Sequence, residues 1–316
     1  MGSETPFTRR SVLGSSAVFG ALGAGLLLPK EGNVAPVGRK LDLDAGPDSA
    51  YAYAKAIGDV DPSAVTYTYM QGEAWGVVPS VESRRLFKIF GLGTTRMGPH
   101  EGGGYKKYHK EVVYYADPDT NEVLNTWYNP WLEREVEVSH IKNTPVNDYL
   151  TDQPVADKSV YTRELAPFHY IEIGNWIVWQ EHTYFIMPNR LPPEKYPLHS
   201  TGEKFHAAEL TGIMARREDL EADTTSAPTI ISWTRFNPWM GFMEMGNRPG
   251  FVSYQQHAAK TDGINGIPKH LRVYMEKHDP EYFEPVMTWT EPAQNMESMI
   301  DFRNKLEAKR AAKGNG

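Results

Sequence analysis

The stretch that decides the fold is YKKYHKEVVYYADPDTNEVLNTWY, which runs from Tyr105 to Tyr128. Residues 105–115 are rich in valine and tyrosine, a composition that is typical of a strand. The polar run ADPDTNE contains residues that are typical of a turn, and residues 123–128 are expected to form the returning strand. This stretch therefore predicts a β-hairpin.

Strand-like patterns continue beyond this hairpin. The run LEREVEVSH alternates so that Val136, Val138 and His140 share one face while three glutamates share the other. The glutamate face belongs in solvent, so His140 should point inward. Many short strands with few helices between them predict a mainly β fold, either an antiparallel barrel or a curved sandwich.

Helices are expected to flank the strands at both ends. Residues 41–60 read as an entry loop followed by one helix, which Asp48 or Ser49 would cap and Gly58 would end. The tail, residues 268–313, carries apolar side chains at helical spacing and predicts two more helices. We expect one β-rich domain covering residues 41–316.

The order aromatic-Asn-Pro-Trp occurs twice, ending at Trp131 and at Trp239. The proline after asparagine has no backbone N–H to donate to a neighbouring strand, so each motif should end a strand. Because each motif follows a hairpin, the sequence is compatible with two related halves, at about 60–150 and 165–260. A packing corner and a wall of a ligand site are both possible roles for the motifs.

The amino terminus reads TRRSVLG from Thr8 to Gly14, followed by a weakly apolar run. This resembles a twin-arginine export signal, so we expect residues 1–35 to be a signal segment and linker. An uncleaved anchor is the alternative, although residues 12–28 are marginal in length for a bilayer. The mature protein is expected to be periplasmic or secreted, without a membrane span, after contact with the twin-arginine export machinery.

The composition excludes several classes of function. The chain has 316 residues, a formal net charge of −7 and no cysteine. Its acidic balance argues against a nucleic-acid partner, and the lack of cysteine excludes disulfides, thiolate metal sites and a cysteine nucleophile. Signatures such as GxSxG and HExxH are missing from the sequence.

Histidine and arginine on strand faces are the remaining candidates for chemistry. His109 shares a strand face with Glu111, and His182 shares one with Trp176 and Val178. Histidine titrates near neutral pH and suits proton transfer, although interior histidines could instead bind a metal or only fill the core. The predicted catalytic residues are His109, His140, His182 and Arg235.

The segment TIISWTRFNPWMGFMEMGNRPG indicates where an apolar substrate would bind. Ile231, Trp233 and Arg235 share a face, and a half-buried arginine must pair with a carboxylate or bind an anionic group. The methionines that follow suit an adaptable apolar pocket. The predicted substrate-binding residues are Tyr114, Trp127, Trp131, Trp233, Trp239, Met243, Glu244 and Arg248.

The twin-arginine leader, the hairpin, EVSHIKNTPVND and WTRFNPWMGFMEMGNRPG together resemble a bacterial family with fungal members, designated domain of unknown function 1838. The resemblance runs from about Ala50 to Phe302. It implies export and one family-wide domain, and it transfers neither catalytic residues nor a cofactor.

The sequence favours an exported enzyme that acts on a small hydrophobic or aromatic molecule by acid–base chemistry: hydrolysis, elimination or isomerisation. In this hypothesis a histidine is the base, a tyrosine or Arg235 stabilises negative charge, and no cofactor is expected. The alternatives are a non-catalytic carrier of apolar ligands and a metal-dependent enzyme that uses interior histidines.

Overall fold

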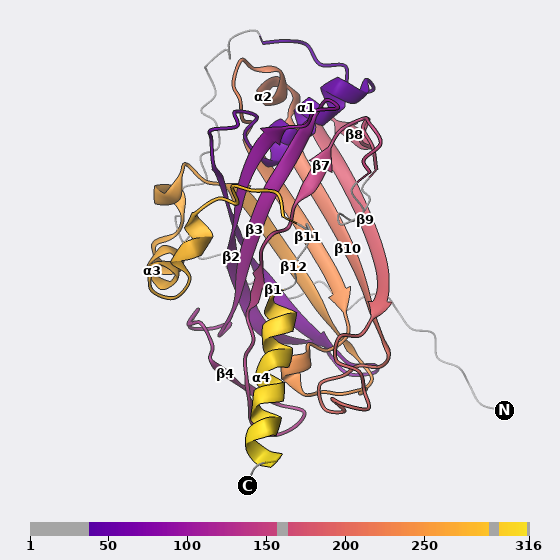
Figure 1. Cartoon of the computed structure of the whole chain (residues 1–316), viewed down its shortest axis with the longest axis vertical. Helices are drawn as coiled ribbons and strands as arrows, with labels where there is room; N and C mark the ends of the chain where they lie inside the picture. The colour runs from indigo at the N-terminus through magenta and orange to yellow at the C-terminus, as the bar shows by residue number, and fades with distance from the viewer. Residues whose placement is uncertain (1–37, 157–163, 291–296, 315–316) are drawn as a thin grey trace, which may run out of the picture. The chain divides into compact units, whose positions relative to one another are not determined.

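One ten-stranded antiparallel sheet dominates the structure, which is a computed structural model (Figure 1). It describes residues 38–156, 164–290 and 297–314, all of which belong to the unit formed by residues 35–316. The predicted signal segment, residues 1–35, lies outside the described residues. The prediction of a mainly β fold with flanking helices is confirmed.

The strands and helices have the following bounds. The large sheet contains β1 (Thr66–Val77), β2 (Arg84–Pro99), β3 (Tyr105–Ala116), β6 (Ile141–Asn143), β7 (Asp148–Leu150), β8 (Tyr170–Ile173), β9 (Trp176–Pro188), β10 (Lys204–Arg216), β11 (Thr229–Asn237) and β12 (Phe251–Lys260). A separate ribbon pairs β4 (Thr126–Asn129) with β5 (Arg134–Glu137). The helices are α1 (Gly46–Ile57), α2 (Arg217–Glu221), α3 (Lys269–His278) and α4 (Glu297–Gly314), with 3-10 turns η1 (Gly241–Met243), η2 (Ile264–Gly266) and η3 (Pro280–Phe283).

The strand order is β6-β3-β2-β1-β12-β11-β10-β9-β8, with β7 also paired to β3. The contact between β1 and β12 joins the first and last strands of the chain in the middle of the sheet. Within the described residues, β6 and β8 do not pair with each other, so the sheet is curved and open rather than a closed barrel. Helix α1 contacts β3, β7 and β10 and so covers one end of the opening (Figure 1).

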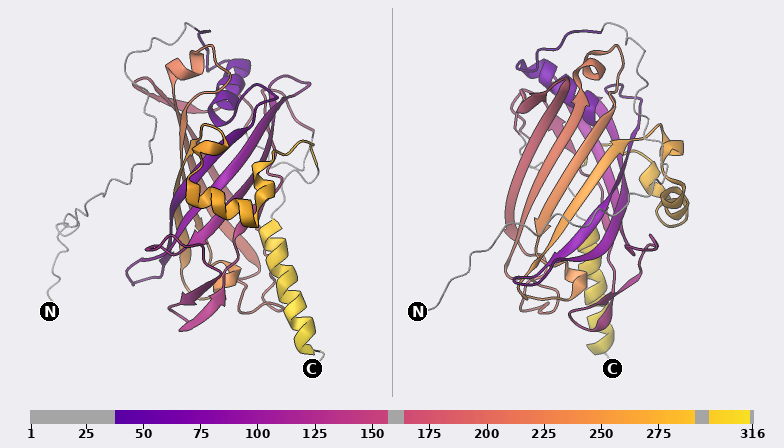
Figure 2. Two further views of the ribbon diagram at one scale, coloured as in Figure 1. Left: turned by 90° about the vertical axis from the view of Figure 1, so that its left-hand side faces the viewer. Right: turned by 180° about the vertical axis from the view of Figure 1, so that it is seen from behind.

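The two faces of the sheet have different surroundings. The inner face encloses a cavity, and the outer face of β2 and β3 is covered by α3 and η3 (Figure 2, left). On that outer face Leu271 and Met275 of α3 pack with Phe90, Leu92 and Tyr114. In the described part of the chain, no helix covers the outer face of β9 to β12 (Figure 2, right).

Glycine allows neighbouring strands of the sheet to approach each other closely. A Cβ on Gly91 of β2 would collide with the carbonyl oxygen of Val112 on β3. The glycine therefore permits the close approach of β2 and β3 in this part of the curved sheet.

The two Asn-Pro-Trp motifs meet at the end of the sheet opposite α1. As predicted, β4 ends at Asn129 and β11 ends at Asn237. The rings of Trp131 and Trp239 lie 5.0 Å apart, and the side-chain amide of Asn129 donates to the carbonyl oxygen of Met243 at 2.7 Å. The motifs form one packing corner, which is what the structural interpretation predicted.

Several local predictions need correction. The predicted hairpin holds only at its turn, where Val123 bridges Ala116 and the N–H of Leu124 donates to the carbonyl oxygen of Tyr115. It is wrong for residues 126–129, which pair with β5, whereas β3 pairs with β2, β6 and β7. Helix α1 does end at Gly58, but its N-cap is Ala45 and no side chain caps it. None of the helices in the described residues has the length and apolar content that crossing a membrane requires.

Candidate functional site

The inner face of the sheet encloses a cavity of about 410 Å³, which is within the usual size range for a small-molecule site. Eight strands of the large sheet contribute lining residues: β1, β2, β3, β6 and β9 to β12. Tyr53 and Ile57 of α1 line it as well, as do Phe302 of α4 and His199 in the connection between β9 and β10.

Two walls of this cavity face each other. At the α1 end, Tyr105 of β3 packs in the same cluster as Ile213 of β10 and Ile231 of β11. Further along β3, the hydroxyl of Tyr115 lies 3.0 Å from that of Tyr254 on β12. The part of β3 between Tyr105 and Tyr115 lines the same cavity as the middle of β10 and β11, and we describe these two parts as its opposite walls.

The first wall carries four polar side chains in a row, which we name the His109 cluster: Thr95, His109, Glu111 and Asn143. The Thr95 hydroxyl lies 2.8 Å from Nδ1 of His109, and Nε2 of His109 lies 3.9 Å from Oε2 of Glu111. The amide of Asn143 donates to Oε1 of Glu111 at 2.7 Å. The register explains the row, since Thr95 of β2 is opposite His109 and Asn143 of β6 is opposite Glu111.

The charge of Glu111 sets the proton position on His109. Burial alone would raise the pKa of Glu111, but contacts with His109 and Asn143 and the charge of Lys107 hold it below its usual range. Glu111 is therefore ionised at neutral pH and favours the proton of a neutral His109 on Nε2. Nδ1 then presents its lone pair toward Thr95, the same carboxylate, imidazole and hydroxyl order that activates hydroxyls in hydrolases.

A glycine makes room for the His109 ring. A Cβ built on Gly93 of β2 would lie 2.8 Å from Cε1 of His109, which is closer than real Cβ atoms approach other atoms. Any other residue at position 93 would displace the imidazole or the strand.

The opposite wall carries the Arg235 cluster, which consists of Arg235, Glu209 and Tyr254. Nη1 of Arg235 donates to Oε1 of Glu209 at 2.9 Å, and the guanidinium lies over the rings of Phe185 and Phe205 at 5.5 and 6.0 Å. Among the described residues this is the only hydrogen bond of the guanidinium, whose buried Nε has no partner. The prediction that Ile231, Trp233 and Arg235 share a face is confirmed. Of the two predicted alternatives for Arg235, a carboxylate partner or an anionic ligand group, the structure shows the carboxylate, which is that of Glu209.

Tyr254 adds a hydroxyl beside Arg235, its register partner across β11 and β12. Burial raises the pKa of Tyr254 to about 12. The hydroxyl therefore keeps its proton at physiological pH and can donate it in a hydrogen bond.

His140 lines the cavity, as its strand alternation predicted, but it is poorly suited to be a base. The backbone N–H of Tyr115 donates a hydrogen bond to Nδ1 of His140, with the two nitrogens 3.2 Å apart, so the ring proton of His140 lies on Nε2. Burial, with a contribution from Lys142, lowers the pKa of His140 to about 4. His140 is therefore neutral near pH 7 and can only donate a hydrogen bond into the cavity.

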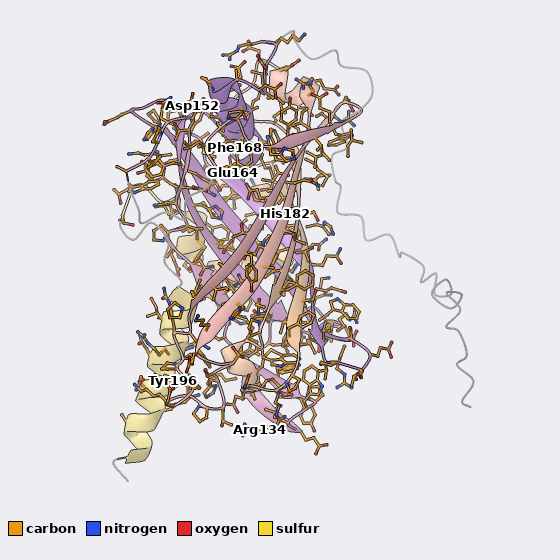
Figure 3. The ribbon with its side chains drawn as sticks, turned by 90° about the vertical axis from the view of Figure 1, so that its right-hand side faces the viewer. Arg134, Asp152, Glu164, Phe168, His182 and Tyr196 are labelled. Atoms are coloured by element: carbon orange, nitrogen blue, oxygen red, sulfur yellow. The ribbon has the colours of Figure 1, made fainter. Side chains whose placement is uncertain are left out.

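The interior placement predicted for His182 is wrong. His182 is exposed on the outer face of β9 (Figure 3). Its neighbour Glu181 lines the cavity and accepts a hydrogen bond from the Tyr53 hydroxyl. Both faces of β9 carry aromatic and aliphatic side chains near its start, so alternation alone did not show which face is inward.

Of the predicted substrate-binding residues, only Trp233 and Trp239 line the cavity. Tyr114 lies on the outer face under α3, where its hydroxyl donates to Asp279 at 2.6 Å. The other five contribute to the packing corner or the nearby surface. Trp127, Trp131 and Met243 belong to or pack against the core cluster there, Glu244 pairs with Arg134 and Arg248 is exposed.

Sequence reasoning missed several polar residues of the cavity. Glu111 was noted beside His109 but not chosen, and the remaining side chains come from strands whose register one sequence does not reveal. The missed lining residues with polar groups include Thr95, Glu111, Asn143, Glu181, His199, Glu209 and Tyr254. Within the described ranges, no group of three or more histidine, aspartate or glutamate side chains is arranged to hold a metal ion.

Comparison with known proteins gives a family but no activity. No curated protein matches the chain. Residues 63–306 match the family model described as Protein of unknown function (DUF1838), and this match covers most of the chain. The chain therefore belongs to the DUF1838 family.

Proposed function

We propose that this protein is an exported enzyme that acts on a small, largely hydrophobic molecule by acid–base chemistry. The observation that carries the proposal is the order Thr95, His109, Glu111 inside a cavity that is also lined by Trp233, Met70 and Ile231. These three polar side chains follow one another at 2.8 and 3.9 Å, and burying polar groups is favourable only where they are paired or used.

His109 is the base in this proposal. Its Nδ1 takes a proton from the Thr95 hydroxyl as that oxygen forms a bond to the substrate, or from a substrate group that replaces that hydroxyl. Glu111 stabilises the imidazolium that results, and Asn143 holds the carboxylate in place. His109 then returns the proton to the departing group or to another atom of the substrate. The relay is compatible with hydrolysis, elimination and isomerisation.

Arg235 and Tyr254 supply the complementary donors. They lie on the wall opposite His109, where negative charge that develops on a substrate oxygen would meet a cation and a neutral hydroxyl. Donors placed in advance in a cavity from which water is largely excluded are among the strongest means of stabilising such charge.

The test uses small apolar molecules extracted from the host and incubated with the protein in D₂O, followed by liquid chromatography and mass spectrometry. Hydrolysis would split one compound, elimination would remove a fragment such as water, and isomerisation through a carbanion would add deuterium. We expect His109→Gln to abolish the change. His182→Gln, which alters the exposed histidine of β9, should behave like the wild type.

A non-catalytic carrier of apolar ligands is the second candidate, and the apolar part of the cavity wall favours it. In that case native mass spectrometry would find a bound molecule that the wild-type protein leaves unchanged in the D₂O experiment. A metal-dependent enzyme, the third hypothesis, would reveal itself as stoichiometric metal in untagged protein purified without chelators.

Export through the twin-arginine pathway remains part of the proposal and rests on Arg9 and Arg10. Replacing both with lysine should leave the protein in the cytoplasm. Equal amounts of wild type and variant in the periplasm would contradict this.

A further inference from the structure

The cavity also indicates what its ligand looks like, and this inference rests on the proposed function because it concerns the same site. We propose that the substrate is an uncharged molecule with an apolar body and a carbonyl oxygen that binds Arg235. The argument depends on the donors of Arg235, on the charges that line the cavity and on the apolar surface between the two walls.

Arg235 has more donors than its protein partners use. A guanidinium carries five N–H donors and no acceptor, so any group that binds it must offer an acceptor. Within the described chain, Nη1 donates to Glu209 and Nη2 donates to no residue. Phe185 and Phe205 contact the guanidinium and fix its plane, while the side chain stays 20% exposed and lines the cavity. Nη2 is thus the donor that a ligand oxygen can reach.

The charges in the cavity disfavour an anionic ligand. Its described lining contains three carboxylates, Glu111, Glu181 and Glu209, and two cations, Lys107 and Arg235. Each cation already has a carboxylate nearby: Arg235 pairs with Glu209, and Nζ of Lys107 lies 3.8 Å from Oδ2 of Asp148. A ligand carboxylate at Arg235 would stand beside Glu209 as a like charge, which is unfavourable, whereas a carbonyl avoids this repulsion.

The surface next to Arg235 is suited to a flat apolar body. Trp233 and Ile231 precede Arg235 on the same face of β11, and Ala258 of β12 lies opposite Ile231. Met70 of β1 is the register partner of Ala258 and continues this apolar row. A carbonyl at Arg235 thus leaves the rest of the ligand on an apolar strip that leads toward the His109 cluster.

A matched set of naphthalene probes tests the inference by binding alone. The probes are 2-acetylnaphthalene, 2-naphthoate and 2-ethylnaphthalene, which share one ring system and differ in the group that would contact Arg235. Affinities are measured by calorimetry at pH 7.5 on the wild type and on Glu209→Gln/Arg235→Gln, in which the ion pair is replaced as a unit so that no charge is left unpaired. Thermal unfolding and binding of the hydrocarbon confirm that the variant is folded.

We expect the ketone to bind the wild type about tenfold more tightly than the hydrocarbon, and this preference to disappear in the double variant. Tighter binding of the carboxylate would overturn the uncharged class. Equal affinity for ketone and hydrocarbon, or no binding of any probe, would overturn the role of Arg235. Because no turnover is measured, a failure here is distinguishable from a failure of the acid–base proposal, which the His109→Gln experiment addresses.

Discussion

The two walls of the cavity hold polar groups in different ways. On the β2–β3 wall, Thr95, His109 and Glu111 follow one another in a row, and Asn143 completes it. On the β10–β11 wall, Arg235 makes one hydrogen bond to Glu209 and no other with described residues. The first wall is organised for moving a proton between its own groups, and the second still has donors for a ligand. In the proposed function, the first wall therefore transfers the proton, and the second wall binds the substrate oxygen and stabilises the charge that develops on it.

The largest expected effect comes from breaking the relay on the first wall. Glu111→Gln keeps the shape and the contact with Asn143 but removes the negative charge that holds the His109 proton on Nε2. We expect a loss of about 10²- to 10⁴-fold in kcat, measured on the substrate that the extract experiment identifies.

Combining Glu111→Gln with His109→Gln shows whether the two residues act together. If His109 and Glu111 form one unit, His109→Gln/Glu111→Gln should be no slower than His109→Gln alone. Losses that multiply would mean that the two residues act independently, and the relay would have to be abandoned.

A smaller effect is expected from moving His109 without changing it. The new Cβ in Gly93→Ala would lie 2.8 Å from Cε1 of His109, so the ring must shift. We expect kcat to fall about tenfold or more, because small misplacements of a catalytic group are costly. Gly212→Ala on β10 is the matched control, since a Cβ there has no atom within 4 Å among the described residues. Equal activity of the two variants would argue against His109 as the base.

The second wall should respond differently. Arg235→Lys keeps the positive charge, which can still stabilise negative charge on the substrate oxygen, but loses the planar fork of donors that binds this oxygen. We therefore expect KM to rise about tenfold with a smaller change in kcat. Arg216→Lys alters an arginine outside the cavity lining and should leave both constants unchanged. A loss in kcat as large as that of Glu111→Gln would erase the distinction between the two walls.

The last expected effect is on stability rather than on activity, and it concerns His140, which lies beside the first wall. The pKa of His140 is about 4 in the folded state, below its usual 6.5, so the unfolded chain binds this proton first as pH falls. Its contribution to the free energy of unfolding is therefore constant above pH 6.5 and decreases from pH 6.5 to 4, by up to about 1.4 kcal/mol per pH unit. Urea unfolding of His140→Gln should show a shallower pH dependence in this range, and an unchanged slope would contradict the buried neutral state.

The sequence predicted the class of fold well, because strand alternation and proline positions are local signals. The inward face of β11, with Ile231, Trp233 and Arg235, and the strand ends at both Asn-Pro-Trp motifs were predicted from such signals. Tyr114 shows the limit of this reasoning. Strand β3 is covered on both faces, by the cavity and by α3, so an apolar run did not reveal which side chains point inward.

The site itself was less predictable because its partners come from different strands. His109 and Glu111 lie two residues apart and could be paired from the sequence. Thr95 and Asn143 reach them only through the register of β2 and β6 on β3. Glu209 likewise meets Arg235 through the pairing of β10 with β11. A single sequence does not specify these registers.

The most direct test of the divided cavity measures affinity and turnover of His109→Gln on one and the same substrate. We predict an affinity within about threefold of the wild type and a turnover at least 100-fold lower, because the substrate is held by the opposite wall. Unchanged turnover would show that His109 is not the base, and a parallel loss of affinity would show that the first wall also holds the substrate.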